Sequence, residues 1–346
     1  MNTEILIENL KKNIVNFYKP EFRTRFLILF DTKTDLSQVL KDAYYNAVTQ
    51  LGHSVDAYDF YKFEEQDLIN DIYEHYVKGD VVIMLQSSSY RVSKFRWRNE
   101  LCQRGLKVLE HGHLHKIQEN EIETFFNSLT YDYQHQKEIT DYLEEKINLC
   151  KNITFINQDG SKLEYSGPMD KCIRNIGEFE EQTNWGSRFP IGELISESLD
   201  LSTLNGDMQV YAFPNLDQFT EFTHPFTCRV EGGFVISHNG PKCFDDVFQL
   251  IKTEHPEGKV YVRELGIGLN RYIKRNQRLG DPIAYERQEG LHFSLGMKHG
   301  IYAKKLWPKY GKKFNQRFHI DVYVNIDKIL IDDILVYSKE KGYFIE

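Results

Sequence analysis

Cysteines and long apolar runs are scarce in this sequence of 346 residues. Its five cysteines are an odd number, lie far apart and form no Cys-x-x-Cys pair, so we expect reduced thiols without a disulfide framework. No apolar run approaches the roughly 18 residues that a membrane-spanning helix needs. The amphipathic N-terminal segment also lacks the apolar region of a signal peptide. These absences predict a cytoplasmic protein with no membrane partner.

An excess of basic residues is absent as well. There are 43 Lys and Arg residues against 51 Asp and Glu residues, a net charge of −8, which argues against a dedicated nucleic-acid-binding protein. Neither a GxxxxGK[ST] phosphate loop nor a GxSxG nucleophile elbow occurs. The length exceeds what one hydrophobic core usually serves, so we expect two ordered domains.

The first 150 residues alternate between strand-like and helix-like segments. Arg25–Asp31 and Asp80–Leu85 are continuous apolar runs, typical of strands that are buried on both faces. Leu36–Leu51 lies between them and has apolar residues at helical spacing. This alternation predicts an α/β domain over residues 1–150 with a doubly wound parallel sheet.

From residue 151 to 346 the pattern changes to short strands separated by glycine turns. Two hairpins are expected, one at Gln158-Asp-Gly160 and one at Glu231-Gly-Gly233. We expect the strand Lys259–Arg263 to end before Glu264, with the following LGIGLN segment forming a bend. The second domain is therefore predicted to be an α+β domain that is rich in antiparallel strands and carries the metal site described below.

Two motifs of the chain are weak signals of a binding site. His111, His113 and His115 would share one face of a strand, but no metal-ligand spacing accompanies them, so a polar loop is favoured over a metal site. Gly266-Ile-Gly268 resembles a dinucleotide loop, but Arg271 stands where the third glycine belongs.

The second half holds a stronger combination of candidate metal ligands. His319 and Asp321 alternate in a strand pattern, which places them on one face roughly 7 Å apart. His292 lies on the polar face of another strand pattern, and Glu264 and Glu193 each follow apolar segments. Three carboxylates and two imidazoles suit paired divalent cations such as Zn²⁺, Mn²⁺ or Co²⁺.

These residues lie in segments that resemble a known group of enzymes. The segments are NWGSRFPIGEL, TCRVEGGFVISHNG, RELGIGLNRY, EGLHFSLG and FHIDV. In order and spacing they resemble the thermophilic-type metallo-aminopeptidases of family M29 and their relatives, the 2,5-dihydroxypyridine dioxygenases. The resemblance covers most of the second domain, and the first domain agrees in layout.

The resemblance implies two alternative metal sites. In the aminopeptidases five residues bind two metals, and the matching positions here are Glu193, Glu264, His292, His319 and Asp321, with Glu264 spanning the metals. The dioxygenases hold one iron with two His and one Asp. Their first His falls where this chain has Glu264, and their positions matching Glu193 and His292 are apolar. On this comparison the chain resembles the dinuclear hydrolases more than the dioxygenases.

The resemblance therefore implies a metal-dependent hydrolase, an aminopeptidase or a related amidohydrolase, that acts on a peptide or small-molecule substrate. Two divalent ions would lower the pKa of a shared water. We expect Glu264 to bridge the ions and His299 or Tyr302 to stabilise the oxyanion. The expected anchors for a substrate carboxylate are Arg188 and Arg263. Glu286 and Glu289 are candidates for accepting the proton of the water, and the resemblance also implies a homodimer.

Two alternatives stay open from the sequence. One is a mononuclear iron dioxygenase in which His292, His319 and Asp321 form a two-His-one-carboxylate triad with open positions. The other is a non-catalytic binding protein with the same fold.

Overall fold

The chain divides into two compact units whose segments alternate along the sequence. The computed structural model describes residues 3–88, 91–92, 95–180, 185–253, 255, 257–298 and 318–345. The first unit comprises Met1–Tyr133, Asn175–Gly192 and Gln277–Ala284. The second unit comprises Gln134–Arg174, Glu193–Asn276 and Tyr285–Glu346. The boundary expected near residue 150 falls inside the second unit.

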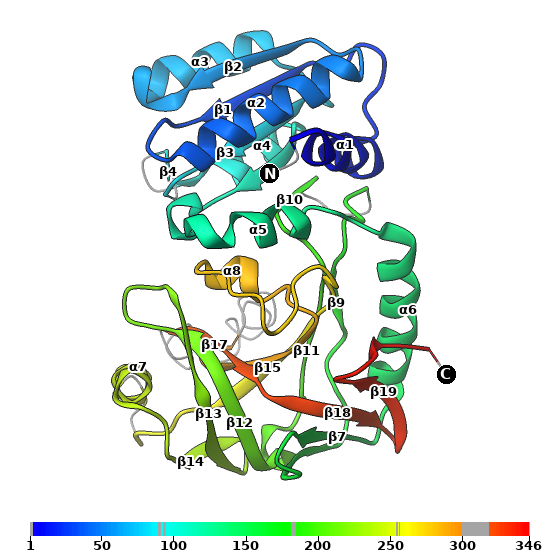
Figure 1. Cartoon of the computed structure of the whole chain (residues 1–346), viewed down its shortest axis with the longest axis vertical. Coiled ribbons are helices and arrows are strands. Elements are labelled where there is room, and N and C mark those ends of the chain that lie inside the picture. The colour runs from blue at the N-terminus through cyan, green and yellow to red at the C-terminus, as the bar shows by residue number, and fades with distance from the viewer. Residues whose placement is uncertain are drawn as a thin grey trace. The chain divides into compact units, whose positions relative to one another are not determined.

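The first unit is built on a parallel sheet of five strands in the order β10-β6-β3-β1-β2 (Figure 1). The strands are β1 (Phe26–Phe30), β2 (Val55–Asp59), β3 (Val81–Leu85), β6 (Lys107–His111) and β10 (Gly186–Arg188). The apolar runs around residues 26–30 and 81–85 form strands, as predicted, and these two strands pair with each other inside the sheet. The edge strand β10, which comes from a distant segment and pairs with β6, was not predicted.

Helices cover both faces of this sheet, which confirms the predicted α/β class. They are α1 (Thr3–Asn13), α2 (Asp35–Gln50), α3 (Glu65–His75), α4 (Trp97–Gln103) and α5 (Ile122–Ser128). Leu68 and Ile72 of α3 and Leu101 of α4 pack on one face, against Leu27 and Val82. Helix α2 has no residue in that cluster and contacts β1 and β3, while α1 packs on α2. The strands are therefore buried on both faces, which explains their continuous apolar sequences.

The second unit contains one large curled antiparallel sheet, as predicted (Figure 1). Eleven of its strands follow the order β20-β19-β18-β7-β8-β12-β17-β16-β15-β11-β9, and a hairpin of β13 and β14 extends from β12. The strands are β7 (Asn152–Asn157), β8 (Lys162–Ser166), β9 (Ile173–Asn175), β11 (Glu193–Glu197), β12 (Asn205–Pro214), β13 (Thr220–Glu231), β14 (Phe234–His238), β15 (Val262–Gly268), β16 (Gly290–Gly296), β17 (His319–Val324), β18 (Ile326–Ile331), β19 (Ile334–Ser338) and β20 (Gly342–Tyr343).

A few short elements complete the described structure. The remaining α-helices are α6 (Tyr133–Leu149), α7 (Lys242–Lys252) and α8 (Pro282–Tyr285). A two-stranded ribbon is formed by β4 (Arg91–Val92) and β5 (Phe95–Arg96). Single turns of 3₁₀- or π-helix are η1 (Ile14–Tyr18), η2 (Phe60–Lys62), η3 (Leu114–Lys116), η4 (Glu119–Glu121) and η5 (Leu201–Thr203).

Strand β15 corrects the expectation that Glu264 precedes a bend. Glu264 lies inside the strand, and Gly266 and Gly268 continue it as fully buried positions. Both glycines are needed for close packing, because a Cβ atom on Gly268 would lie 1.9 Å from the Gln288 carbonyl oxygen, and Gly266 is equally crowded. Glycine within a strand here indicates close approach of a neighbour, and not a turn.

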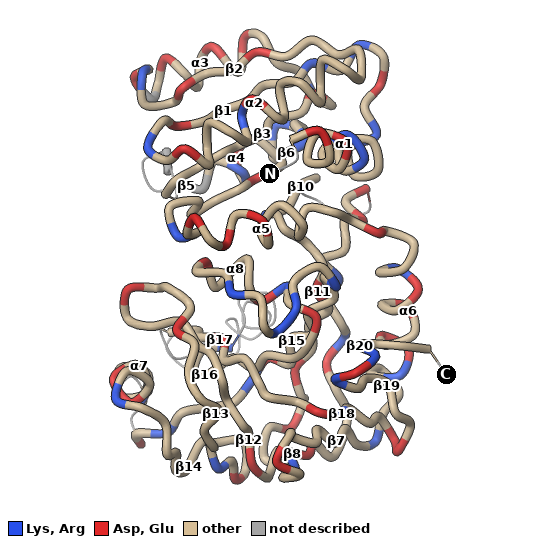
Figure 2. Tube along the Cα trace, viewed as in Figure 1, with Lys and Arg blue, Asp and Glu red and all other residues tan. Residues whose placement is uncertain are grey.

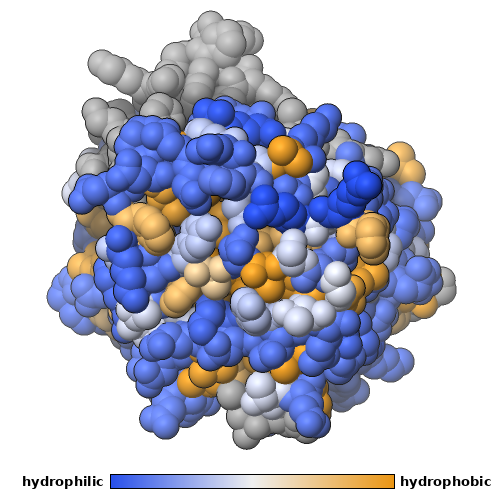
Figure 3. Space-filling view, turned by 90° about the horizontal axis from the view of Figure 1, so that it is seen from above, coloured by the Kyte–Doolittle hydropathy of each residue, from blue (hydrophilic) through white to orange (hydrophobic). Residues whose placement is uncertain are grey.

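Acidic and basic residues are interspersed along the elements of both units (Figure 2). The face in Figure 3 is mostly hydrophilic, with hydrophobic side chains scattered among polar ones. Among the described residues, no helix has the length and apolar character to cross a membrane.

Candidate metal centre

Five candidate ligands converge on four adjacent strands of the second unit. The strands are β11, β15, β16 and β17, which are neighbours in the sheet. Glu193, Glu264 and His292 each offer one ligand atom within 4.8 Å of the others, and so do Glu264, His319 and Asp321. We call these the Glu193 group and the Asp321 group. Glu264 belongs to both groups, so its predicted proximity to Asp321 is confirmed.

Glu264 directs its two carboxylate oxygens toward different histidines. Its Oε1 atom lies 3.8 Å from His292 Nε2, and its Oε2 atom lies 3.7 Å from His319 Nε2. At the two ends of the cluster, His292 Nε2 is 3.3 Å from Glu193 Oε1, and His319 Nε2 is 3.1 Å from Asp321 Oδ1. A carboxylate in this position has the orientation that bridging two ions requires.

A β-bulge sets the direction of the Glu264 side chain. Val262 pairs with Leu295 and Leu265 with Phe293, so two residues of β15 oppose the single residue Ser294 of β16. The backbone N–H of Glu264 donates to Ser294 Oγ at 3.0 Å. Bulges re-aim side chains in this way beside functional sites.

His319 is oriented by its second ring nitrogen. Its Nδ1 atom lies 3.1 Å from the Met297 carbonyl oxygen, which leaves Nε2 directed toward Asp321 and Glu264. A metal-binding histidine is commonly held by such a bond from its other nitrogen to a carbonyl group.

The donor set fits a divalent cation. Glu193 and Glu264 are each 3% exposed and His292 is 1% exposed. Glu264 Oε2, His292 Nε2 and Asp321 Oδ1 are buried, and each lies 3.1–3.8 Å from another member of the cluster without forming a well-aligned hydrogen bond in the described structure. Leaving buried polar atoms unpaired is costly, and a cation between them would satisfy all three. Carboxylate oxygens and imidazole nitrogens are ligands for Zn²⁺, Mn²⁺, Co²⁺ and Fe²⁺.

The electrostatic environment of the cluster favours protonated histidines when no metal is bound. Burial lowers the pKa of His319, but the adjacent Asp321 and Glu264 carboxylates outweigh it and raise that pKa to about 10. The pKa of His292 is also raised, because Glu193 and Glu264 outweigh its burial. Burial raises the pKa of Asp321, but His319 and its neighbours hold it below the usual value. A metal ion therefore competes with protons for the two imidazoles.

Two residues next to the cluster were not singled out as its partners from the sequence. The guanidinium of Arg287 contacts Glu193 Oε2 and lies 2.8 Å from Glu286 Oε1. Glu286, a candidate proton acceptor, hydrogen-bonds to Asp321, and burial raises the pKa of Glu286. Their only sequence signal is a pair of adjacent opposite charges, which is common on exposed surfaces. The other candidate proton acceptor, Glu289, instead pairs with Lys274.

The two arginines proposed as substrate anchors have protein partners. Arg263 donates from Nε to the Gly296 carbonyl oxygen at 2.9 Å, and its Nη1 lies 3.2 Å from Glu197 Oε1. Arg188 belongs to the first unit, where its Nη2 lies 3.9 Å from Asp281 Oδ2. Neither arginine joins the ligand groups, and their role in substrate binding stays a prediction. His299 and Tyr302 lie outside the described residues.

The three histidines at the end of β6 and just after it have three different partners. His111 is fully buried, and its Nε2 lies 2.7 Å from the Tyr44 hydroxyl. His113 Nδ1 lies 3.4 Å from Asp281 Oδ1, and His115 Nδ1 contacts the Ser87 carbonyl oxygen. In the described part of the chain, these histidines form no candidate metal group.

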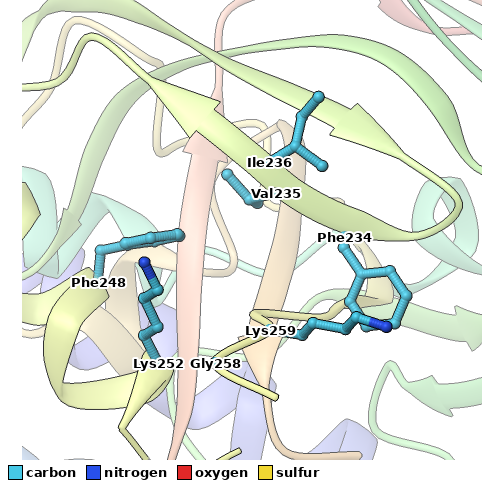
Figure 4. Close-up of a pocket in the computed structure, with 7 residues that line it drawn as sticks. All are labelled: Phe234, Val235, Ile236, Phe248, Lys252, Gly258 and Lys259. Carbon is cyan, nitrogen blue, oxygen red and sulfur yellow. The ribbon is translucent and has the colours of Figure 1, made fainter.

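A separate surface pocket of about 250 Å³ lies beside β14 and α7 (Figure 4). It is lined by Phe234, Val235, Ile236, Phe248, Lys252, Gly258 and Lys259. None of these residues belongs to the ligand cluster.

Comparisons with known proteins place the fold. No protein-family model and no curated protein sequence matches the chain. Two solved structures resemble its whole length. One is 2,5-dihydroxypyridine dioxygenase from Pseudomonas putida KT2440, with a TM-score of 0.61 and 14% identity, covering 100% of this chain and 99% of that one. The other is wild-type AmpT from Thermus thermophilus, with a TM-score of 0.59 and 9% identity, covering 100% of both chains. The resemblance expected from the motifs is thus confirmed as a shared fold over the full length of the chain.

Proposed function

We propose that this chain is a metal-dependent hydrolase that uses two divalent ions, an aminopeptidase or a related amidohydrolase. The observation that carries the proposal is the position of Glu264 in both ligand groups, with one oxygen toward each histidine. A shared carboxylate offsets the repulsion between two cations about 3.5–4 Å apart. The same fold in AmpT, an M29 aminopeptidase, supports this assignment.

The residues of the cluster have distinct roles in this proposal. Glu193 and His292 would hold one ion, His319 and Asp321 would hold the other, and Glu264 would be shared by both. When bound, the ions supply an acidified water and polarise the scissile carbonyl. Glu286, which hydrogen-bonds to Asp321 and whose pKa is raised by burial, would hold a proton at its carboxyl group beside the cluster. His299 or Tyr302 is retained as the expected donor to the oxyanion, and Arg188 and Arg263 as anchors for a substrate carboxylate.

A mononuclear iron dioxygenase is the second candidate, since the fold is also that of a 2,5-dihydroxypyridine dioxygenase. The arrangement of ligands supports it less. His292, His319 and Asp321, the triad that this alternative requires, do not form one candidate group among the described residues. Each histidine instead shares a group with Glu264.

The two candidates are separated by parallel assays on one metal-free preparation. Loaded with Mn²⁺, Co²⁺ or Zn²⁺, the protein is expected to hydrolyse amino-acid p-nitroanilides or small amides. Loaded anaerobically with Fe²⁺, it is expected to consume no oxygen on 2,5-dihydroxypyridine. Oxygen uptake without hydrolysis would reverse the assignment. Failure to bind any of these metals would instead favour the non-catalytic alternative.

The expected homodimer rests on the resemblance and stays a prediction. Light scattering at working concentration is expected to give twice the mass of the 40.9 kDa chain. A mass equal to that of one chain would contradict it.

A further inference from the structure

The two ligand groups differ in their contact with permanent positive charge. In the Glu193 group, Arg287 Nη1 contacts Glu193 Oε2, while Glu193 Oε1 faces His292. The side chain of Arg287 is only 6% exposed, and that of Glu193 is 4% exposed, so water screens this contact poorly. One of the two oxygens of Glu193 is therefore already engaged by a cation.

In the described part of the chain, the two carboxylates of the Asp321 group have no direct contact of this kind, and the charge of Arg287 acts on them less strongly than on Glu193. Among the described residues, no Lys or Arg forms an ion pair with Glu264 or Asp321. The nearby cations Arg263 and Lys298 both pair with Glu197, which belongs to neither group. Asp321 pairs with His319, whose positive charge is lost when the imidazole binds a metal, and it also hydrogen-bonds to Glu286.

We infer that Arg287 makes the two metal positions unequal, so that the Asp321 group binds the first ion tightly and the Glu193 group binds the second weakly. This inference rests on the proposed dinuclear function. A dication entering the Glu193 group meets the charge of Arg287 in direct contact with one of its ligands, whereas the same charge acts less strongly on the ligands of the Asp321 group. Arg287 also limits Glu193 to one oxygen for the metal.

The consequence is regulation of the site by metal supply. At a limiting concentration of free metal, the protein holds one ion, bound by Glu264, His319 and Asp321. The second ion, and with it the dinuclear centre, forms only when free metal rises. Arg287 is in this sense a positioning residue that sets the stoichiometry, and it does not touch the reacting atoms.

The test is a titration of metal-free protein with Mn²⁺. Binding is measured by calorimetry and, independently, by the electron paramagnetic resonance signal of the Mn²⁺ that stays free. Wild-type protein is expected to bind two ions in steps whose dissociation constants differ by at least about 100-fold. Arg287→Gln removes the charge and is expected to tighten the weaker step by at least about tenfold, with the stronger step changed less than about threefold. Arg287→Lys keeps the charge and is the matched control, expected to retain the wild-type difference.

Two results overturn the inference while leaving the proposed function intact. The first is wild-type protein that binds two ions with equal dissociation constants. The second is an Arg287→Gln variant in which the weaker of the two binding steps is unchanged or is weaker still. The second result would make Arg287 an orienting partner of Glu193. If the wild type and every variant bind at most one ion per chain, the proposed function itself is overturned. Circular dichroism shows whether Arg287→Gln folds. If it does not, a double variant, Glu286→Gln with Arg287→Gln, is titrated in its place, because it removes both charges of the Glu286–Arg287 ion pair.

Discussion

Gly266 and His292 face each other across β15 and β16, and the glycine is in contact with the imidazole. The two residues are direct partners in the antiparallel register. A Cβ atom on Gly266 would lie 1.9 Å from His292 Nε2, the nitrogen that points to Glu193 and Glu264. The absence of a side chain at position 266 is therefore what allows Nε2 of His292, the candidate ligand atom, to lie over the strand.

Gly266→Ala is expected to displace His292 and to weaken metal binding. Its methyl group cannot fit without movement of the ring, so we expect a loss of at least about tenfold in affinity at the Glu193 group. The accompanying cost in the free energy of unfolding is about 1–3 kcal/mol, as for other overpacked positions. Metal titration and urea unfolding measure the two effects separately. Wild-type metal affinity in this variant would show that His292 is not a ligand.

Removal of metal is expected to destabilise the protein. The cluster places three carboxylates and two imidazoles together, and an ion that binds only the folded state stabilises it by mass action. At a free metal concentration 1,000 times the dissociation constant, the gain is about 4 kcal/mol. The melting temperature is therefore expected to fall in a chelator and to return when Mn²⁺ or Zn²⁺ is added. An unchanged melting temperature would contradict a high-affinity site.

Metal affinity is expected to rise with pH across the neutral range. The pKa of His319 is raised to about 10 in the metal-free protein, so at pH 7 its imidazole is protonated and must release that proton before it binds a metal. Below this pKa, affinity for the ion at the Asp321 group should increase by about tenfold per pH unit. Calorimetry in buffers of different ionisation enthalpy counts the protons released. Binding without proton release would mean that His319 is neutral or is not a ligand.

His111 is expected to make the first unit sensitive to acid. Burial, together with Arg188, lowers the pKa of His111 from 6.5 to about 3. Above pH 6.5 the imidazole is neutral in both the folded and the unfolded protein, so it does not affect the free energy of unfolding. As the pH falls from 6.5 to 3, only the unfolded chain takes up the proton, so the folded state loses stability. At pH 5 this amounts to about 2 kcal/mol. His111→Gln is expected to lose less stability than the wild type between pH 7.5 and 5 in urea unfolding. An equal loss would contradict the assignment.

The sequence predicted the parts of the fold that follow from local periodicity. The apolar runs of β1 and β3 and the alternation around His292 and Asp321 specify buried strands and their faces. The sequence did not predict the order of strands in the second unit or the pairing of β10 with β6, because both depend on contacts between residues far apart in the chain. The glycines at 266 and 268 misled the assignment, since glycine marks both turns and close packing.

The candidate ligands were found through the resemblance and through their residue types. Of their charged neighbours, Glu286 was named only as one of two candidate proton acceptors, and Arg287 was not named. Glu286 and Arg287 show no periodicity that separates them from a surface ion pair. Arg287 reaches Glu193 only because β15 pairs with β11 on one side and with β16, which follows Arg287 in the chain, on the other. Contacts of this kind depend on tertiary structure and leave no local pattern.

The most direct test of the account is the metal content of Glu264→Gln. The substitution keeps the shape of the side chain and removes the charge that is shared by both ligand groups. With excess Mn²⁺, we expect two ions per wild-type chain and at most one per Glu264→Gln chain, measured on folded protein by equilibrium dialysis and elemental analysis. Hydrolysis is expected to fall by at least about 10²-fold, or roughly 2.7 kcal/mol of transition-state stabilisation. A wild-type chain that binds a single ion, together with a Glu264→Gln chain that keeps that ion and full activity, would contradict the dinuclear site.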